Sequence, residues 1–430
     1  EDPDLRSSNP NPEAYRDAWS MRASSEWVKD QLTLKPYLRR SQMTFLQHFL
    51  PGQPLENNEQ TSGGLIVSYA IDAGDTSANV GGQIELMSGA LTEFQEGPTV
   101  GSAFLVATRP AGLHYDYDVD SQLIAGFYDL QHRVTDSFRV LHSLRLEYLS
   151  YEYTNNHIVG NTKDDGTNCG FGGCLYTRPA SRDDSFTNVG ARLGFEKDLA
   201  AGLLYANASR GFRPPQVTEL YRLRGGQSIA DLDSEDLTAV EAGFKNESIA
   251  VAFFAERTRD FLFRDSEAFN VSDGRTQSMG VEFSGQRQIG RHEFQLAATY
   301  AKHEYDFARD ADADGREEIT DGNELDSAPR WIGHAAWRTA ITDTLKQELE
   351  VNRVGSHFLN AANTARYKGH YAVNWRLQWQ ASASTEISLR VMNLLDERYA
   401  DRADFAFGSY RYFPAMPRQV YLGARMILDC

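Results

Sequence analysis

The sequence has 430 residues, of which 24% are charged, and a formal net charge of −17. An acidic chain lacks the basic face that neutralises phosphates, which excludes nucleic acid as a partner. There is no stretch of about 18 consecutive apolar residues, which excludes a protein built from membrane helices. A membrane β-barrel remains compatible with the low hydropathy, because each barrel strand shows lipid only at every second residue.

Apolar and polar residues alternate with a period of two along most of the chain, and helical periodicity is almost absent. The clearest runs lie at 140–148, 279–286, 293–300, 373–379, 386–391 and 420–426. Such alternation is typical of strands that have one apolar and one polar face.

From about residue 114 onward, short and long connections alternate. Tight turns lie at 134–137, 197–200, 289–291, 341–344 and 381–384, and long polar connections at 155–184, 211–236, 306–328, 359–368 and 395–416. Hairpins with short turns at one end and long loops at the other are typical of outer-membrane barrels. The strands, mostly about 10 to 16 residues long, can cross a bilayer at a tilt.

We therefore predict an all-β fold, a transmembrane antiparallel up-and-down β-barrel with about 17 readable strands. The sheet is expected to close, because an open edge cannot be satisfied in lipid. Tryptophans near strand ends fit the aromatic girdles of such barrels, although ordinary packing explains any one of them equally well. These tryptophans are Trp27, Trp331, Trp337, Trp375 and Trp379.

Two of the three cysteines, Cys169 and Cys174, flank a short segment rich in glycine. Glycine lets such a segment bend back until the two sulfurs meet, which predicts a disulfide and an oxidising compartment. Two free thiols or half of a metal site are the alternatives. Cys430 is interpreted as incidental.

Several segments in the second half of the chain carry a family resemblance. They are Tyr205–Pro215 with Thr218–Tyr221, Leu237–Phe244, Gly280–Glu282, Ala328–Arg330, Val391–Tyr399 and Tyr412–Arg418. In order and spacing they resemble signatures of TonB-dependent outer-membrane receptors. Among these signatures are a strand that ends in R-G-F-R-x-P, an E-x-G strand, a G-x-E strand start and an N-L-x-D-x-x-Y segment. The resemblance covers residues 185–430 by motif and 19–154 by strand pattern only.

The resemblance implies a receptor in the outer membrane of a Gram-negative bacterium that takes up a scarce nutrient, most often a ferric siderophore. Its implied partners are outer-membrane lipid, a TonB-type energy-coupling protein and the ferric chelate, with no cofactor and no enzymatic activity. Family barrels have about 22 strands and a plugged lumen. Because this chain shows neither the plug nor the energy-coupling box, we expect residues 1–430 to be the barrel domain without its plug and first strands.

Two other functions remain open. One is a passive porin of about 16 to 18 strands, which the strand count favours and the motifs oppose. The other is an outer-membrane enzyme. The histidines lack metal-ligand spacing and no nucleophile motif is present, so no catalytic residue is predicted. A Ser/His/Asp set assembled from distant strands stays possible on sequence alone.

The loop after Arg210 is the first candidate ligand site. It carries Arg213, Arg222 and Arg224 together with Tyr221. Guanidinium groups beside an aromatic ring suit an anionic chelate, which they hold through forked hydrogen bonds and stacking. The alternative is that Arg210 and Arg213 fix the loop on carboxylates of the barrel wall.

The last long loop is the second candidate, because it mixes aromatic rings with both signs of charge. Arg402, Phe405, Tyr410 and Arg411 are its candidate ligand contacts. The alternative is a packed loop whose polar groups satisfy one another.

The third candidate is a calcium loop at Asp310, Asp312 and Asp314, with Asp321 at the twelfth place. Carboxylates at alternate positions followed by glycine resemble an EF-hand loop, although aspartate replaces the closing glutamate and strands replace the flanking helices. The alternative is a solvated acidic loop.

Overall fold

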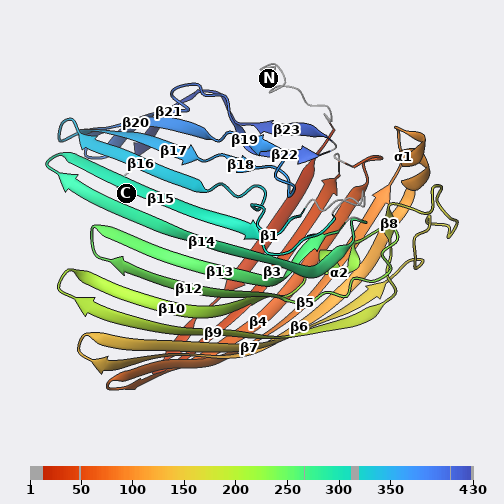
Figure 1. Ribbon diagram of the computed structural model, residues 1–430, viewed down its shortest axis with the longest axis horizontal. Helices are drawn as coiled ribbons and strands as arrows, with labels where there is room; N and C mark the ends of the chain where they lie inside the picture. The colour runs from red at the N-terminus through yellow and green to blue at the C-terminus, as the bar shows by residue number, and fades with distance from the viewer. Residues whose placement is uncertain (1–12, 48–49, 266, 311–318, 407, 428–430) are drawn as a thin grey trace.

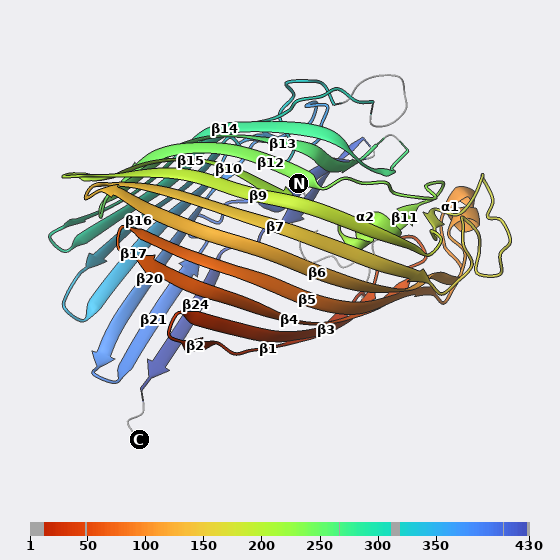
Figure 2. The same ribbon diagram turned by 90° about the horizontal axis from the view of Figure 1, so that it is seen from below.

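Long strands make up almost all of the molecule (Figure 1). The structure, a computed structural model, describes residues 13–47, 50–265, 267–310, 319–406 and 408–427. The strands lie side by side in a curved sheet, with long loops and both short helices at one end and tight turns at the other (Figure 1, Figure 2). No helix in the described part of the chain is long and apolar enough to cross a membrane.

The wall of the barrel is one 18-stranded sheet. Its strands are β1 (Arg16–Ser24), β2 (Trp27–Lys29), β3 (Leu32–Leu46), β4 (Leu55–Ala73), β5 (Thr76–Gln95), β6 (Gly112–Thr135), β7 (Phe138–Asn155), β9 (Arg182–Leu199), β10 (Gly202–Arg213), β12 (Glu235–Lys245), β13 (Ile249–Arg264), β14 (Asn270–Ile289), β15 (His292–Tyr305), β16 (Trp331–Ala340), β17 (Leu345–Val354), β20 (His370–Ser382), β21 (Thr385–Met392) and β24 (Gln419–Met426).

The loop end carries the remaining elements. They are the helices α1 (Ala103–Thr108) and α2 (Val217–Tyr221), and the strand pairs β8 (Tyr176–Thr177) with β11 (Leu223–Arg224), β18 (His357–Phe358) with β19 (Arg366–Tyr367), and β22 (Ala400–Ala406) with β23 (Ser409–Pro414).

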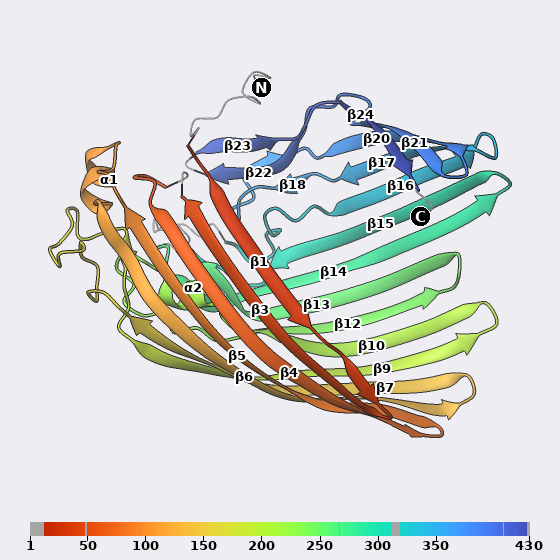
Figure 3. The same ribbon diagram turned by 180° about the vertical axis from the view of Figure 1, so that it is seen from behind.

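Each wall strand pairs antiparallel with the next one along the chain, which confirms the predicted up-and-down order (Figure 3). β1 and β2 pair in succession with β3, so together they occupy one position in the wall. The pairings run from there to β24, which pairs with β21. The expected closure is absent from them, because no pairing among the described residues joins β24 to β1 or β2.

The two faces of the sheet differ as the alternation predicts. Large apolar side chains stand exposed on the convex face, such as Leu86 at 58% and Phe253 at 62%. The lumenal face carries hydrogen-bonded polar groups; for example, the Tyr37 hydroxyl donates to Glu85 at 2.5 Å. A face that is apolar and exposed is stable only against lipid, whereas the polar face lines the lumen.

Four cross-strand pairs on the lumenal face place an aromatic ring over a glycine, which has no Cβ to obstruct it. The pairs are Tyr37 with Gly64, Phe127 with Gly81, Tyr205 with Gly243 and Phe254 with Gly280. A Cβ at Gly280 would lie 2.7 Å from the Phe254 ring and 2.6 Å from the carbonyl oxygen of Tyr300. The glycines of the E-x-G and G-x-E segments are therefore required for steric reasons, since Gly243 lies under the Tyr205 ring and Gly280 under the Phe254 ring.

We predict that Gly280→Ala destabilises the barrel by about 1–3 kcal/mol, because the added methyl group overpacks the Phe254 ring. Unfolding by urea in lipid vesicles, followed by tryptophan fluorescence, measures the loss. Gly126→Ala is the matched control, since a Cβ there meets nothing within 4 Å. Equal stability of the two variants would contradict the steric account.

Candidate ligand-binding site

A cavity of about 680 Å³ opens inside the loop end of the barrel. Its wall includes residues from the loop ends of β3, β4, β5, β6 and β13 and from the segment that follows α2. The charged residues that line it are Arg16, Arg109, Arg222, Arg224, Arg264, Glu56, Glu93 and Glu219. Five arginines against three glutamates leave an excess of positive charge in this cavity.

The segment containing α2 brings arginines to the cavity. After β10, the buried Pro215 leads into α2, where Gln216 and Glu219 form a capping box that starts the helix. At the end of the helix Tyr221 is fully buried, stacked on Tyr153 with ring centroids 4.3 Å apart. Burial raises the pKa of the Tyr221 hydroxyl, and the hydrogen bond that this hydroxyl donates to Asp184 at 2.7 Å raises it further. Anchoring at Tyr221 directs the next residues inward.

Arg222 joins this segment to strands β4 and β5 of the wall. Its guanidinium donates to Glu56 at 2.7 Å and forms an ion pair with Glu93. Glu56 and Glu93 are 6% and 1% exposed. Burial opposes the charge of Arg222, but the two carboxylates outweigh it and hold its pKa above the ordinary value. Gln47 also donates to Glu56, at 2.5 Å, so the pair is part of a buried network.

Two other arginines are poorly neutralised. Arg109 is 7% exposed, and its Nη1 has no hydrogen-bond partner among the described residues; the nearest carboxylate, that of Glu93, lies 3.8 Å away. Burial lowers the pKa of Arg109; the carboxylate of Glu93 acts against burial, and the charges of Arg224 and Arg222 add to its effect. Burial likewise lowers the pKa of Arg224, together with the neighbouring charge of Arg264. An anion entering the cavity would relieve this repulsion and take up the unused donors.

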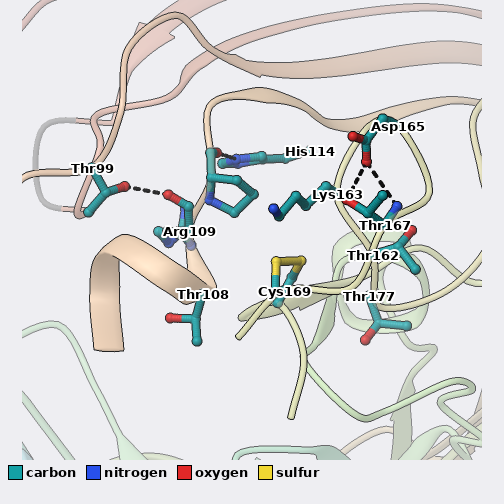
Figure 4. Close-up of a disulfide and its surroundings, with 12 residues drawn as sticks. Thr99, Thr108, Arg109, His114, Thr162, Lys163, Asp165, Thr167, Cys169 and Thr177 are labelled. Atoms are coloured by element: carbon teal, nitrogen blue, oxygen red, sulfur yellow. Dashed lines mark hydrogen bonds between the residues drawn. A yellow bond between two sulfur atoms is a disulfide. The ribbon is translucent and has the colours of Figure 1, made fainter. Parts of the chain in front are cut away.

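The long loop at 155–184 supports the backbone next to Arg109 (Figure 4). The disulfide between Cys169 and Cys174 is present, with 5.0 Å between the Cα atoms. Gly170 donates to the carbonyl of Ala107 at 3.2 Å, and Leu175 to that of Thr108 at 2.9 Å. These bonds hold the end of α1, next to Arg109, against the short loop that the predicted disulfide closes.

The structure separates the candidates that were predicted in the loop after Arg210. Arg224 lines the cavity, whereas Tyr221 is buried in the wall beneath it. Arg213 pairs with Glu235 at 2.7 Å and with Glu219 at 3.1 Å, so it fixes α2 on the wall, as the alternative interpretation expected. Contact of Arg213 with a ligand stays a prediction.

The last long loop folds as the hairpin β22–β23, outside this cavity. Arg402 and Arg411 both pair with Asp404, at 3.4 and 2.5 Å. Phe405 and Tyr410 pack edge to face, with ring centroids 5.1 Å apart. The loop therefore satisfies most of its own groups, and contact of these four residues with a ligand stays a prediction.

The calcium prediction rests partly on Asp312 and Asp314, which lie outside the described residues. In the described part of the chain no cluster of carboxylate, histidine and cysteine side chains is arranged to hold a metal ion. Calcium at Asp310 and Asp321 stays a prediction.

Sequence reasoning missed Arg109, Arg264, Glu56 and Glu93. Arg264 is far from the other three in the sequence, and Glu56 meets Glu93 only through the pairing of β4 with β5. The one local signal was that Glu56 and Glu93 are acidic residues near the ends of alternating runs.

The fold and the cavity define a β-barrel of the outer-membrane type. The family described as TonB dependent receptor-like, beta-barrel, matches residues 4–394. The chain belongs to this family, whose barrels lie in the outer membrane of Gram-negative bacteria. No curated protein sequence matches the chain.

Three solved structures illustrate the likeness in fold. The ferric yersiniabactin uptake receptor FyuA from Yersinia pestis has a TM-score of 0.70 and 18% identity, over 96% of this chain and 61% of its own. The ferric-catecholate import receptor Fiu from E. coli K12 has a TM-score of 0.70 and 16% identity, over 96% and 65%. The copper transporter OprC has a TM-score of 0.70 and 13% identity, over 96% and 65%. The chain thus spans less than two thirds of these relatives.

We predict that Arg222→Gln destabilises the loop end by about 3 kcal/mol, because it removes the closest cation from the buried Glu56 and Glu93. Limited proteolysis of the α2 segment and thermal unfolding in detergent micelles measure the loss. Arg222→Lys, which keeps the charge, is expected to lose less. Combining Arg222→Gln with Glu93→Gln should restore part of the stability, and a strictly additive further loss would contradict the pairing.

Proposed function

We propose that this chain forms the barrel of an outer-membrane receptor that takes up an anionic metal chelate, in the first instance a ferric one. The observation that carries the proposal is the arginine-lined cavity at the loop end, where the Nη1 atom of Arg109 has no hydrogen-bond partner among the described residues and Glu93 lies 3.8 Å from it. The family supports the uptake role, and two of the similar structures, FyuA and Fiu, are receptors for ferric chelates.

The charge of the cavity favours an anionic ligand over a neutral or cationic one. Guanidinium forks bind carboxylate and other oxyanion groups bidentately, and they are strongest where water is excluded. Arg222 is already neutralised by Glu56 and Glu93, so Arg109, Arg224 and Arg264 are the groups offered to the ligand.

Uptake is proposed to depend on a TonB-type energy-coupling partner, as the family implies, and no covalent chemistry is assigned to the chain. A passive porin is disfavoured by the family match. In this account the barrel contributes recognition, and the partner drives release of the chelate to the inside.

The proposal predicts that purified protein binds ferric citrate and ferric catecholates, which are anionic, and not the cationic ferrioxamine B. The double variant Arg109→Gln/Arg224→Gln should weaken binding at least about tenfold, since each lost charged hydrogen bond is worth about 1.5–3 kcal/mol. Quenching of tryptophan fluorescence measures the affinity. Equal binding of ferrioxamine B would contradict an anion site.

Arg133→Gln/Arg291→Gln is the matched control, because it removes two arginine charges at the tight-turn end of the barrel, away from the cavity. Its affinity for ferric citrate should equal that of the wild type. Uptake of radiolabelled iron into cells with and without the energy-coupling partner tests the second part of the proposal. Uptake that persists without the partner would support a passive channel instead.

A further inference from the structure

A shallow apolar groove of about 510 Å³ crosses β9, β10, β12 and β13. Register places Phe195, Ala206, Ala242 and Phe253 in one row across these four strands. The exposed Phe195 and Phe253 form the walls of the groove, and the two alanines form its floor. Because Phe253 belongs to the exposed apolar face, the groove is continuous with the surface that contacts lipid.

Arginines stand at the loop end of this groove, on the same face of the sheet. Arg210 follows Ala208 by two residues and Arg257 follows Ala255 by two residues, a step of about 7 Å along each strand. Arg275 lies beside them on β14. The side chains of these three arginines are 53%, 50% and 51% exposed.

Carboxylates neutralise this basic rim only in part. Arg210 pairs with Asp236, while Arg257 and Arg275 share Asp306. The aspartates of these pairs are only 18–23% exposed, but the arginines are half exposed at the surface. Surface ion pairs contribute little, about 0–1 kcal/mol, so an incoming phosphate can compete for the arginines.

The rim is a local feature of a chain whose net charge is −17. On the neighbouring strands β6, β7 and β9 the same face carries acidic groups near the loop end. They are Asp118, Asp120, Glu152 and Asp183, which register places side by side. These strands thus carry an acidic sector and a basic sector on the outer face, and the alanine-floored groove lies at the edge of the basic sector.

We propose that the groove and its basic rim bind one phosphorylated, acylated glycolipid of the outer leaflet. An acyl chain lies between Phe195 and Phe253, and a headgroup phosphate accepts hydrogen bonds from Arg210 and Arg257. Apolar and electrostatic contacts then act together, and such a pair of signals is what stable lipid attachment requires. The site lies on the outer face of the wall and is independent of the lumenal cavity.

Titration of the purified full chain in neutral detergent micelles with fluorescent bisphosphorylated lipid A tests the proposal. Arg210→Gln/Arg257→Gln should weaken binding at least about tenfold, the loss expected for charged hydrogen bonds. Arg40→Gln/Arg353→Gln is the matched control, because both arginines lie on the outer face of other strands, and it should bind as the wild type does. Loss of binding in the control to the same extent would overturn the proposal.

Two further arms separate the contributions of phosphate and acyl chain. Ala242→Phe fills the groove and should weaken binding of lipid A with the arginines intact. Lipid A without phosphates should bind the wild type and the arginine variant equally. Unchanged binding in Ala242→Phe, or displacement of lipid A by inorganic phosphate alone, would overturn the acylated ligand. Heat-modifiable mobility on gels confirms that each variant is folded.

Discussion

Every backbone donor and acceptor in lipid must find its partner within the protein, and this constraint determines the rest of the structure. Along the wall the chain meets it with long antiparallel strands, each paired to the next, and only the edges at β1, β2 and β24 lack a partner strand in the described pairings. Pairing in a sheet forces neighbouring side chains to opposite faces, so one constraint produces both the apolar exterior and the polar lumen. The low hydropathy of the sequence is a consequence of the same alternation.

The loop end is stabilised by other interactions, because there the strands leave the lipid and polar groups come together. Buried ion pairs hold the loop end together. The most important join Arg222 to Glu56 and Glu93 and so attach the α2 segment to strands β4 and β5. Breaking such a pair is costly because it leaves a buried charge alone, so the arrangement holds the segment in one position. The cavity arginines are oriented by that attachment and by the disulfide loop behind α1.

The fold was predictable because its signal is local: a period of two is visible in any single strand, and the glycines opposite Tyr205 and Phe254 lie in recognisable segments. The disulfide was predictable for the same reason. The cavity was not, because Arg222 meets Glu56 and Glu93 only through the folding of segments far apart in sequence. Arg224, which lines the cavity, was named as a candidate from its loop. Nothing in the local sequence distinguishes it from Arg213, which forms an ion pair with Glu235 in the structure. Closure of the sheet was expected from physics and is absent from the described pairings.

The most direct test of the central claim places a nitroxide label at successive positions of one strand in lipid vesicles. Val240 and Ala242 are on the outer face of β12, and Glu241 lies between them on the lumenal face. Labels at Val240 and Ala242 should collide more often with oxygen, which dissolves in lipid, than with a water-soluble nickel chelate. A label at Glu241 should show the reverse preference. Equal accessibility at the three positions, or a reversed order, would contradict the assignment of the two faces.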